Sequence, residues 1–166
     1  MYVMGDRHML SSVEDRFNGY CRALLENGLQ IRREYVYRSA LFDEVFFKAP
    51  AAEKEYIQLL NAKTLYERYL NLPEKPDAIC FVNDVSAAEL IRYTCSLGSD
   101  IRKTAEIGGF DDLEKTAELG FCTVRQNFYS MGKRSLSALD RLIRGLPVPD
   151  KTAVKTELIL KKSINK

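Results

Sequence analysis

Short apolar runs alternate along the chain with longer stretches that have helical periodicity. The run AICFV, residues 78–82, is almost continuously apolar, as in a strand buried on both faces of a parallel sheet. Comparable short runs lie at 2–5, 34–40, 105–110, 121–124 and 153–162. Helical spacing of apolar residues occurs at 11–28, 51–72, 85–97 and 130–146. Strands that alternate with helices predict an α/β fold with a parallel sheet flanked by helices.

Polar residues follow several of the predicted strands directly. They are Gly5-Asp6-Arg7, Asn83-Asp84, Asp111-Asp112 and Arg125-Gln126. Ligands of parallel α/β sheets bind just beyond the carboxyl ends of the strands, and carboxylates, amides and arginine suit a hydroxyl-rich ligand such as a sugar. The same residue types also cap helices and form turns. We interpret Asp84 and Asp112 first as capping residues, whereas both interpretations stay open for Asn83 and Asp111.

Composition excludes several function classes. The 25 basic and 23 acidic residues nearly balance, so charge gives no argument for binding to nucleic acid or membrane. No apolar run approaches the roughly 20 residues of a membrane span, and a cytoplasmic protein is expected. The only histidine is His8 and there is no CxxC motif, so neither a metal nor another cofactor is predicted. The four cysteines, Cys21, Cys80, Cys95 and Cys122, are interpreted as buried, reduced thiols.

Four stretches, in order, make the chain recognisable: SSVEDRFNGYCRAL, PDAICFVNDVSAAEL, IGGFDDLEKTAELGFCTVRQNFYSMG and ELILKKS. Together they resemble the effector-binding domain of the LacI/GalR family of bacterial transcription regulators. The resemblance implies a periplasmic-binding-protein-like fold of type I, in which two α/β lobes enclose a ligand cleft. It also implies a cytoplasmic dimer that binds a small-molecule effector, and operator DNA only through an N-terminal domain that is missing here.

The resemblance also implies how the chain is divided. Residues 1–126 match the second lobe, residues 127–150 match a returning segment of the first lobe, and residues 151–166 match the final strand and tail of the second lobe. The DNA-binding head and most of the first lobe are expected to lie outside this sequence. We therefore expect half of a ligand cleft.

Five residues match ligand-contacting positions of the family. They are Arg16, Asn83, Asp111, Gln126 and Phe128. The chain departs from the family pattern in three places. The family usually has proline where Gly120 stands and often has VP where this chain has SDIRK, residues 99–103, and the loop around 41–50 matches no family segment. No catalytic residue is predicted.

Three functions compete at this point. The first is the effector-sensing domain of a LacI/GalR-type repressor, which requires no catalysis. The second is a solute-binding protein for sugar transport with the same fold. The third is an enzyme or phosphate acceptor that uses Asp111 and Asp112, although no serine–histidine or cysteine–histidine set is evident.

Helix 85–97 carries more apolar surface than one packing face needs. Its apolar residues cover an arc of roughly 220° on a helical wheel, whereas a surface helix needs a stripe of about 100°. We therefore predict a homodimer through this helix, since most oligomers are symmetric. The alternative is that the excess faces the last helix or a part of the first lobe that lies outside this sequence.

Overall fold

The structure is a computed structural model that describes residues 1–5, 11–39, 46 and 48–161. Asp6, Arg7, His8 and Phe47 lie outside the described residues, as does most of the unmatched loop around 41–50. The polar end predicted for the first strand therefore lies outside them, apart from Gly5.

A parallel sheet forms the centre of the molecule, as the sequence pattern predicts. Its strands are β1 (Tyr2–Gly5), β2 (Val36–Ser39), β3 (Ala78–Phe81) and β4 (Glu106–Gly108), in the order β2-β1-β3-β4. Parallel bridges from Gly108 to Cys122 and from Asp111 to Arg125 continue the sheet toward β5 (Thr123–Arg125). Strand β6 (Glu157–Ile159) pairs with β5 in the antiparallel direction. The carboxyl ends of β3, β4 and β5 therefore lie along one edge.

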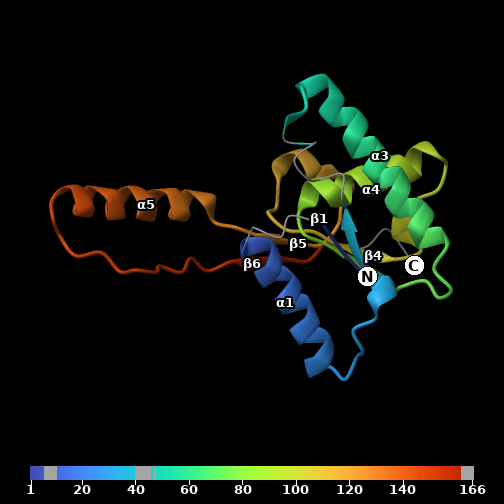
Figure 1. Ribbon diagram of the computed structural model, residues 1–166, viewed down its shortest axis with the longest axis horizontal. Helices are drawn as coiled ribbons and strands as arrows, with labels where there is room; N and C mark the ends of the chain where they lie inside the picture. The colour runs from blue at the N-terminus through green and yellow to red at the C-terminus, as the bar shows by residue number, and fades with distance from the viewer. Residues whose placement is uncertain (6–10, 40–45, 47, 162–166) are drawn as a thin grey trace.

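Helices cover the two faces of the sheet unequally. Helix α1 (Ser11–Glu26) lies on one face, and α3 (Ala51–Leu70) and α4 (Asp84–Ser96) lie on the other (Figure 1). Side chains alternate along β1, so Tyr2 and Met4 pack toward α1, whereas Val3 joins the main core with α3 and α4. The main core is larger than the cluster beneath α1, in which three of the described residues are buried.

The described residues also form three short 3-10 helices. They are η1 (Arg33–Tyr35), η3 (Ile101–Lys103) and η4 (Glu114–Leu119). Helix η4 ends at Gly120, whose φ of 68° is left-handed. Proline cannot adopt that φ, so the turn differs locally from the proline-containing turn that the family resemblance implies.

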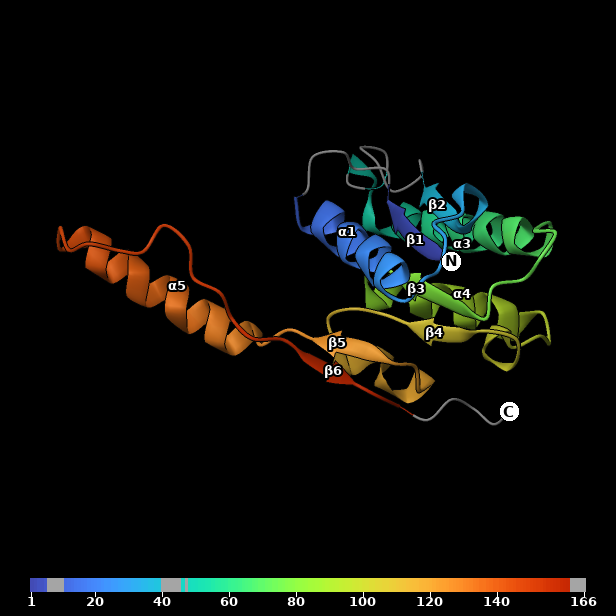
Figure 2. The ribbon, with the colours of Figure 1, turned by 90° about the horizontal axis from the view of Figure 1, so that it is seen from below.

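Helix α5 (Phe128–Ile143) projects away from this body, and residues 144–156 run back along it to β6 (Figures 1 and 2). None of the residues of α5 is buried. Its large apolar side chains are exposed, namely Phe128, Tyr129, Met131, Leu136, Leu139, Leu142 and Ile143. Among the described residues, no element covers these exposed side chains of the amphipathic helix.

Two sequence-based interpretations are wrong in part. The broad apolar arc of α4 does not stay open for a partner, because Leu90, Ile91 and Thr94 are fully buried within the chain. Tyr93 also contacts Tyr66 of α3, edge to face, whereas Cys95 and Leu97 remain exposed. The cysteines are not buried as expected, since Cys95 is exposed and the other three are partly exposed.

Candidate functional site

Arg16 brings α1 to the carboxyl ends of β3 and β4. Its Nη1 donates a hydrogen bond of 2.6 Å to the carbonyl oxygen of Val82, the residue before Asn83. The guanidinium carbon lies 3.9 Å from the centre of the Phe110 ring. The stacking and the hydrogen bond hold the Arg16 guanidinium in place at the edge of the sheet. Its remaining N–H groups are further hydrogen-bond donors.

Asp111 lies beside Arg16, as the sequence predicts. One carboxylate oxygen of Asp111 is 3.8 Å from Nη2 of Arg16, and the same oxygen accepts a 2.6 Å hydrogen bond from Nε2 of Gln126. Three residues from α1, the end of β4 and the end of β5 therefore converge. Their convergence is observed, whereas a role of each in ligand binding stays a prediction.

The backbone at Asp111 and Asp112 is strained. Their φ angles are 116° and 54°, a region that side-chain-bearing residues rarely adopt. Asp112 is held by Arg125, whose Nε donates to its carboxylate over 2.6 Å, and Arg125 also pairs with Glu157 of β6. Strained residues that the surrounding structure holds in place are common at ligand sites.

Asp84 supports this strained turn from beneath. The side chain of Asp84 is almost fully buried, and its two oxygens accept hydrogen bonds from the Thr123 hydroxyl (2.6 Å) and the Leu113 amide (2.9 Å). Its own amide donates to the Phe110 carbonyl over 2.8 Å. Asp84 therefore joins the start of α4 to both ends of the turn that carries Asp111. The capping role expected for Asp84 is wrong, because Asn83 is the N-cap of α4.

The other two predicted site residues are placed differently. The side-chain oxygen of Asn83 accepts a 2.9 Å hydrogen bond from the Ser86 amide, so Asn83 serves as a helix cap. Phe128 is the first residue of α5, and 53% of its surface is exposed. Phe128 is therefore not part of a core within the described residues, and its proposed ligand contact stays a prediction, as does that of Asn83.

The environment of Asp111 affects its charge. Partial burial raises the pKa of its carboxyl group, and the nearby Asp84 acts in the same direction. The hydrogen bond from Gln126 and the positive charge of Arg16 act in the opposite direction, without cancelling the effect of burial. A carboxylate that is partly desolvated next to an arginine is well suited to accept hydrogen bonds from ligand hydroxyls.

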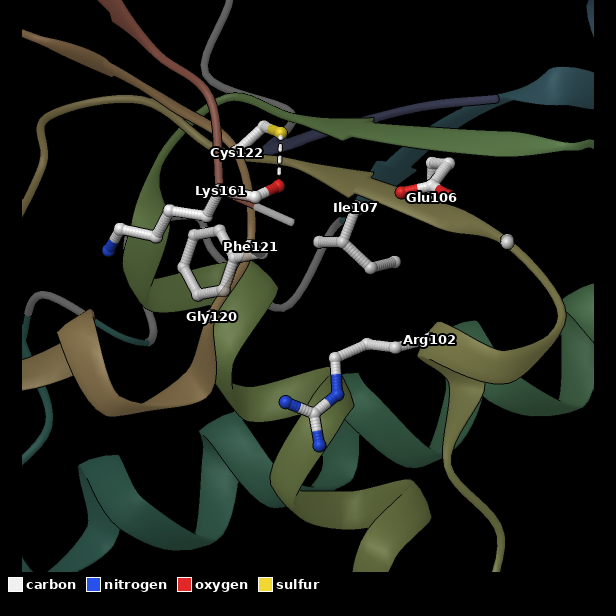
Figure 3. Close-up of a pocket in the computed structure, with 8 residues that line it drawn as sticks. Arg102, Glu106, Ile107, Gly120, Phe121, Cys122 and Lys161 are labelled. Atoms are coloured by element: carbon white, nitrogen blue, oxygen red, sulfur yellow. Dashed lines mark hydrogen bonds between the residues drawn. The ribbon is translucent and has the colours of Figure 1, made fainter. Parts of the chain in front are cut away.

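Cavities adjoin this site on two sides. Arg16 and Phe110 line an open cavity of about 370 Å³ that continues along α1. Gln126 and Asn127 line another of about 290 Å³, between α5 and the returning segment. A third hollow, lined by Arg102, Phe121 and Lys161, measures only about 10 Å³ and holds no more than a water molecule (Figure 3).

Sequence reasoning missed two residues that shape the site. Phe110 supports Arg16, and Gly109 lies against buried Asp84 and Phe121 with no room for a side chain. The glycine pair 108–109 before the aspartates was a visible signal. Which of the two glycines is required depends on contacts that the sequence does not show.

The fold and the site define one class of protein. The chain forms a parallel α/β sheet flanked by helices, with an arginine, a carboxylate and an amide together at its strand ends. The model of the periplasmic binding protein-like domain matches residues 1–164, and the chain belongs to this family. Within it, the chain is homologous to LacI-family transcription regulators.

Two relatives are from Bacillus subtilis (strain 168). An uncharacterized HTH-type transcriptional regulator, YkvZ, is 26% identical over 136 residues, which are 82% of this chain and 37% of YkvZ. The ribose operon repressor is 24% identical over 155 residues, which are 92% of this chain and 41% of the repressor. The structure of a complex of the transcriptional regulator CelR with cellobiose has the same fold, with a TM-score of 0.70 and 21% identity, over 98% of this chain and 45% of that one. The chain thus spans less than half the length of each of these three proteins.

None of the described helices is both long and apolar enough to cross a bilayer. Among the residues that the structure describes, no group of three or more histidine, cysteine, aspartate or glutamate side chains is arranged to hold a metal ion.

Proposed function

We propose that this chain is the second lobe of the effector-sensing domain of a cytoplasmic LacI/GalR-type repressor, and that its effector is a sugar or sugar derivative. The observation that carries the proposal is the convergence of Arg16, Asp111 and Gln126 at the strand ends. This set offers charged donors, a carboxylate acceptor and an amide on one surface, which is the chemistry that hydroxyl groups require. The names of the ribose operon repressor and of the cellobiose complex support a sugar.

The projecting helix α5 supports a two-lobed arrangement. In this proposal residues 127–150 return to a first lobe, and the exposed apolar stripe of α5 packs on that lobe. A ligand bound between the lobes would shift the equilibrium between an open and a closed arrangement of the two lobes. This shift would change how well a dimer fits operator DNA. DNA contact would come from an N-terminal domain, and no catalytic step is needed.

A homodimer through α4 remains part of the proposal in a narrower form. The exposed end of α4, at Leu97, is available for contact, whereas Leu90 is not. A Leu97→Glu variant of the intact regulator should lower the fraction of dimer measured by sedimentation, with an unchanged circular dichroism spectrum. An unchanged dimer would refute this interface.

The effector proposal is tested by Asp111→Ala in the intact regulator, with an operator-release assay against a panel of monosaccharides and disaccharides. The variant should still bind operator DNA but should need at least tenfold more effector, because one charge-assisted contact is worth about 1.5–3 kcal/mol. Asp112→Ala is the matched control, since Arg125 and not the predicted ligand surface holds that carboxylate. Normal effector release by the Asp111→Ala variant would refute the assignment.

A further inference from the structure

The turn at residues 110–113 follows β4 and carries Asp111. Its backbone has positive φ angles at two consecutive residues, 116° at Asp111 and 54° at Asp112. Neither residue is glycine, so both conformations cost free energy. Such a conformation persists only where contacts from outside the turn hold it. The residues that supply those contacts therefore decide where the Asp111 carboxylate lies.

Asp84 holds the two ends of this turn. Its amide donates a 2.8 Å hydrogen bond to the Phe110 carbonyl oxygen, and one of its carboxylate oxygens accepts a 2.9 Å hydrogen bond from the Leu113 amide. Asp84 is the first residue of α4, which packs in the main core through Ala87 and Leu90. Because α4 is anchored in this way, Asp84 is a fixed point to which the turn is attached.

Thr123 extends this support to the middle of the turn. Its hydroxyl group donates a 2.6 Å hydrogen bond to the other carboxylate oxygen of Asp84 and accepts a 3.3 Å hydrogen bond from the Asp112 amide. The Asp111 amide donates to the Val124 carbonyl oxygen over 2.8 Å. All four residues of the turn are thus hydrogen-bonded, and Asp84 or Thr123 is the partner of three of them. We call Asp84 and Thr123 the supporting pair.

The supporting pair is buried and chemically specific. Asp84 is 1% exposed and Thr123 is 2% exposed, so neither side chain presents a surface to a ligand. A buried carboxylate is costly unless its oxygens are hydrogen-bonded, and here each oxygen has a donor. An asparagine side chain has only one acceptor oxygen and could satisfy only one of the two donors. The complete set of bonds therefore requires aspartate at this position.

The same junction also holds Arg16. The Phe110 ring lies 3.9 Å from the guanidinium carbon of Arg16, and the carbonyl of Phe110 is bonded to Asp84. Val82, two residues before Asp84, accepts the hydrogen bond from Arg16. Asp84 thus connects the supports of Arg16 with the turn that carries Asp111. The separation of 3.8 Å between these two predicted ligand contacts depends on that connection.

We propose that Asp84 and Thr123 are positioning residues of the effector site, which set the place of the Asp111 carboxylate beside Arg16 and thereby the affinity for the effector. This inference rests on the proposed function and adds two buried residues that act through Asp111. Without the supporting pair, the turn relaxes toward unstrained φ angles and carries the carboxylate away from Arg16. Effector affinity then falls, whereas operator binding in the absence of effector is unaffected.

The first experiment is a double-mutant cycle in the intact regulator. Operator release is measured with ribose, glucose, galactose and cellobiose, and the sugar that releases the wild type at the lowest concentration is the probe. Thr123→Val removes the hydroxyl group but keeps the branched shape, and it should raise the concentration for half release by about three- to tenfold. In an Asp111→Ala background, Thr123→Val should change that concentration less than about twofold, because its effect passes through Asp111.

Thr94 provides the matched control for this cycle. It is a fully buried threonine of α4, and its hydroxyl group bonds to the Ile91 carbonyl and the Ile101 amide instead. Thr94→Val should leave the half-release concentration within about twofold of the wild type, and Thr123→Ser should restore most of the response. Equal effects of Thr123→Val with and without Asp111, or no effect, would overturn the positioning role alone. A normal response of Asp111→Ala, or a wild type that none of the sugars releases, would instead refute the proposed function.

A second experiment needs no effector. The side-chain amide of Gln126 donates to the Asp111 carboxylate over 2.6 Å, so its NMR signals report where that carboxylate lies. In the 166-residue chain, Thr123→Val and Asp84→Asn should move these signals toward their position in Asp111→Ala, whereas Thr94→Val should leave them in place. Unmoved Gln126 signals in both variants of the supporting pair would overturn the proposal, even where the variants are less stable.

Discussion

Replacing Gly109 by alanine should disrupt the turn that carries the candidate site. A Cβ added at Gly109 would overlap a carboxylate oxygen of Asp84 and would lie 2.7 Å from a ring carbon of Phe121. Both neighbours are buried, and Asp84 is held by the Thr123 hydroxyl and the Leu113 amide, so neither can move away freely. Some of these contacts must therefore break.

The expected loss of stability follows from two effects. Overpacking of a closely packed interior typically costs about 1–3 kcal/mol. A displaced Asp84 would also lose a hydrogen bond to a charged group, which is worth about 1.5–3 kcal/mol. The two costs do not add fully, because a shift of Asp84 that relieves the overlap is also what breaks its hydrogen bond. We therefore expect a decrease of about 2–4 kcal/mol in the free energy of unfolding, measured by urea denaturation.

The neighbouring glycine provides a matched control. A Cβ at Gly108 would meet only the Cys80 sulfur at 3.8 Å, which is ordinary van der Waals contact. Gly108→Ala should therefore change stability by no more than about 0.5 kcal/mol. If Gly109→Ala unfolds at the same urea concentration as Gly108→Ala, the packing argument around Asp84 is refuted.

Two further predictions concern the carboxylates of the site. Asp84→Ala should destabilise by about 2–4 kcal/mol, because it leaves the buried Thr123 hydroxyl and the partly buried Leu113 amide without their acceptor. Asp84→Asn, which keeps one oxygen, should lose less, and equal losses in urea denaturation would contradict this role. Burial raises the pKa of Asp111 above its ordinary value of 3.8. Between that pH and the raised pKa, the folded protein therefore binds more protons than the unfolded chain. The titration of Asp111 thus lowers the free energy of unfolding as the pH rises through this range. Asp111→Asn, which can still accept from Gln126, should therefore gain stability relative to the wild type as pH increases from below 3.8. A difference between the two unfolding free energies that does not change with pH would show that Asp111 does not titrate in this way.

The amino-acid sequence by itself determined the elements and the class of fold. Residues 78–82 are apolar because Ile79 and Phe81 lie in the main core, whereas Val82 and the partly buried Cys80 pack toward α1. The 3.6-residue periodicity of α1 and α4 comes from their packing against the sheet. The short apolar runs that end in polar residues also located the edge where Arg16 and Asp111 meet. These signals are local, since each depends on residues within one or two turns of a helix or within one strand.

Only the tertiary structure decided which polar residue does what. Asn83 and Asp84 are adjacent and chemically similar, yet one caps α4 and the other binds Thr123, 39 positions away in the sequence. Likewise, the wide apolar arc of α4 predicted a partner, but the pattern could not tell a second copy from α3 of the same chain. A hydrophobic pattern specifies how much surface must be buried, whereas the identity of the covering surface depends on long-range packing.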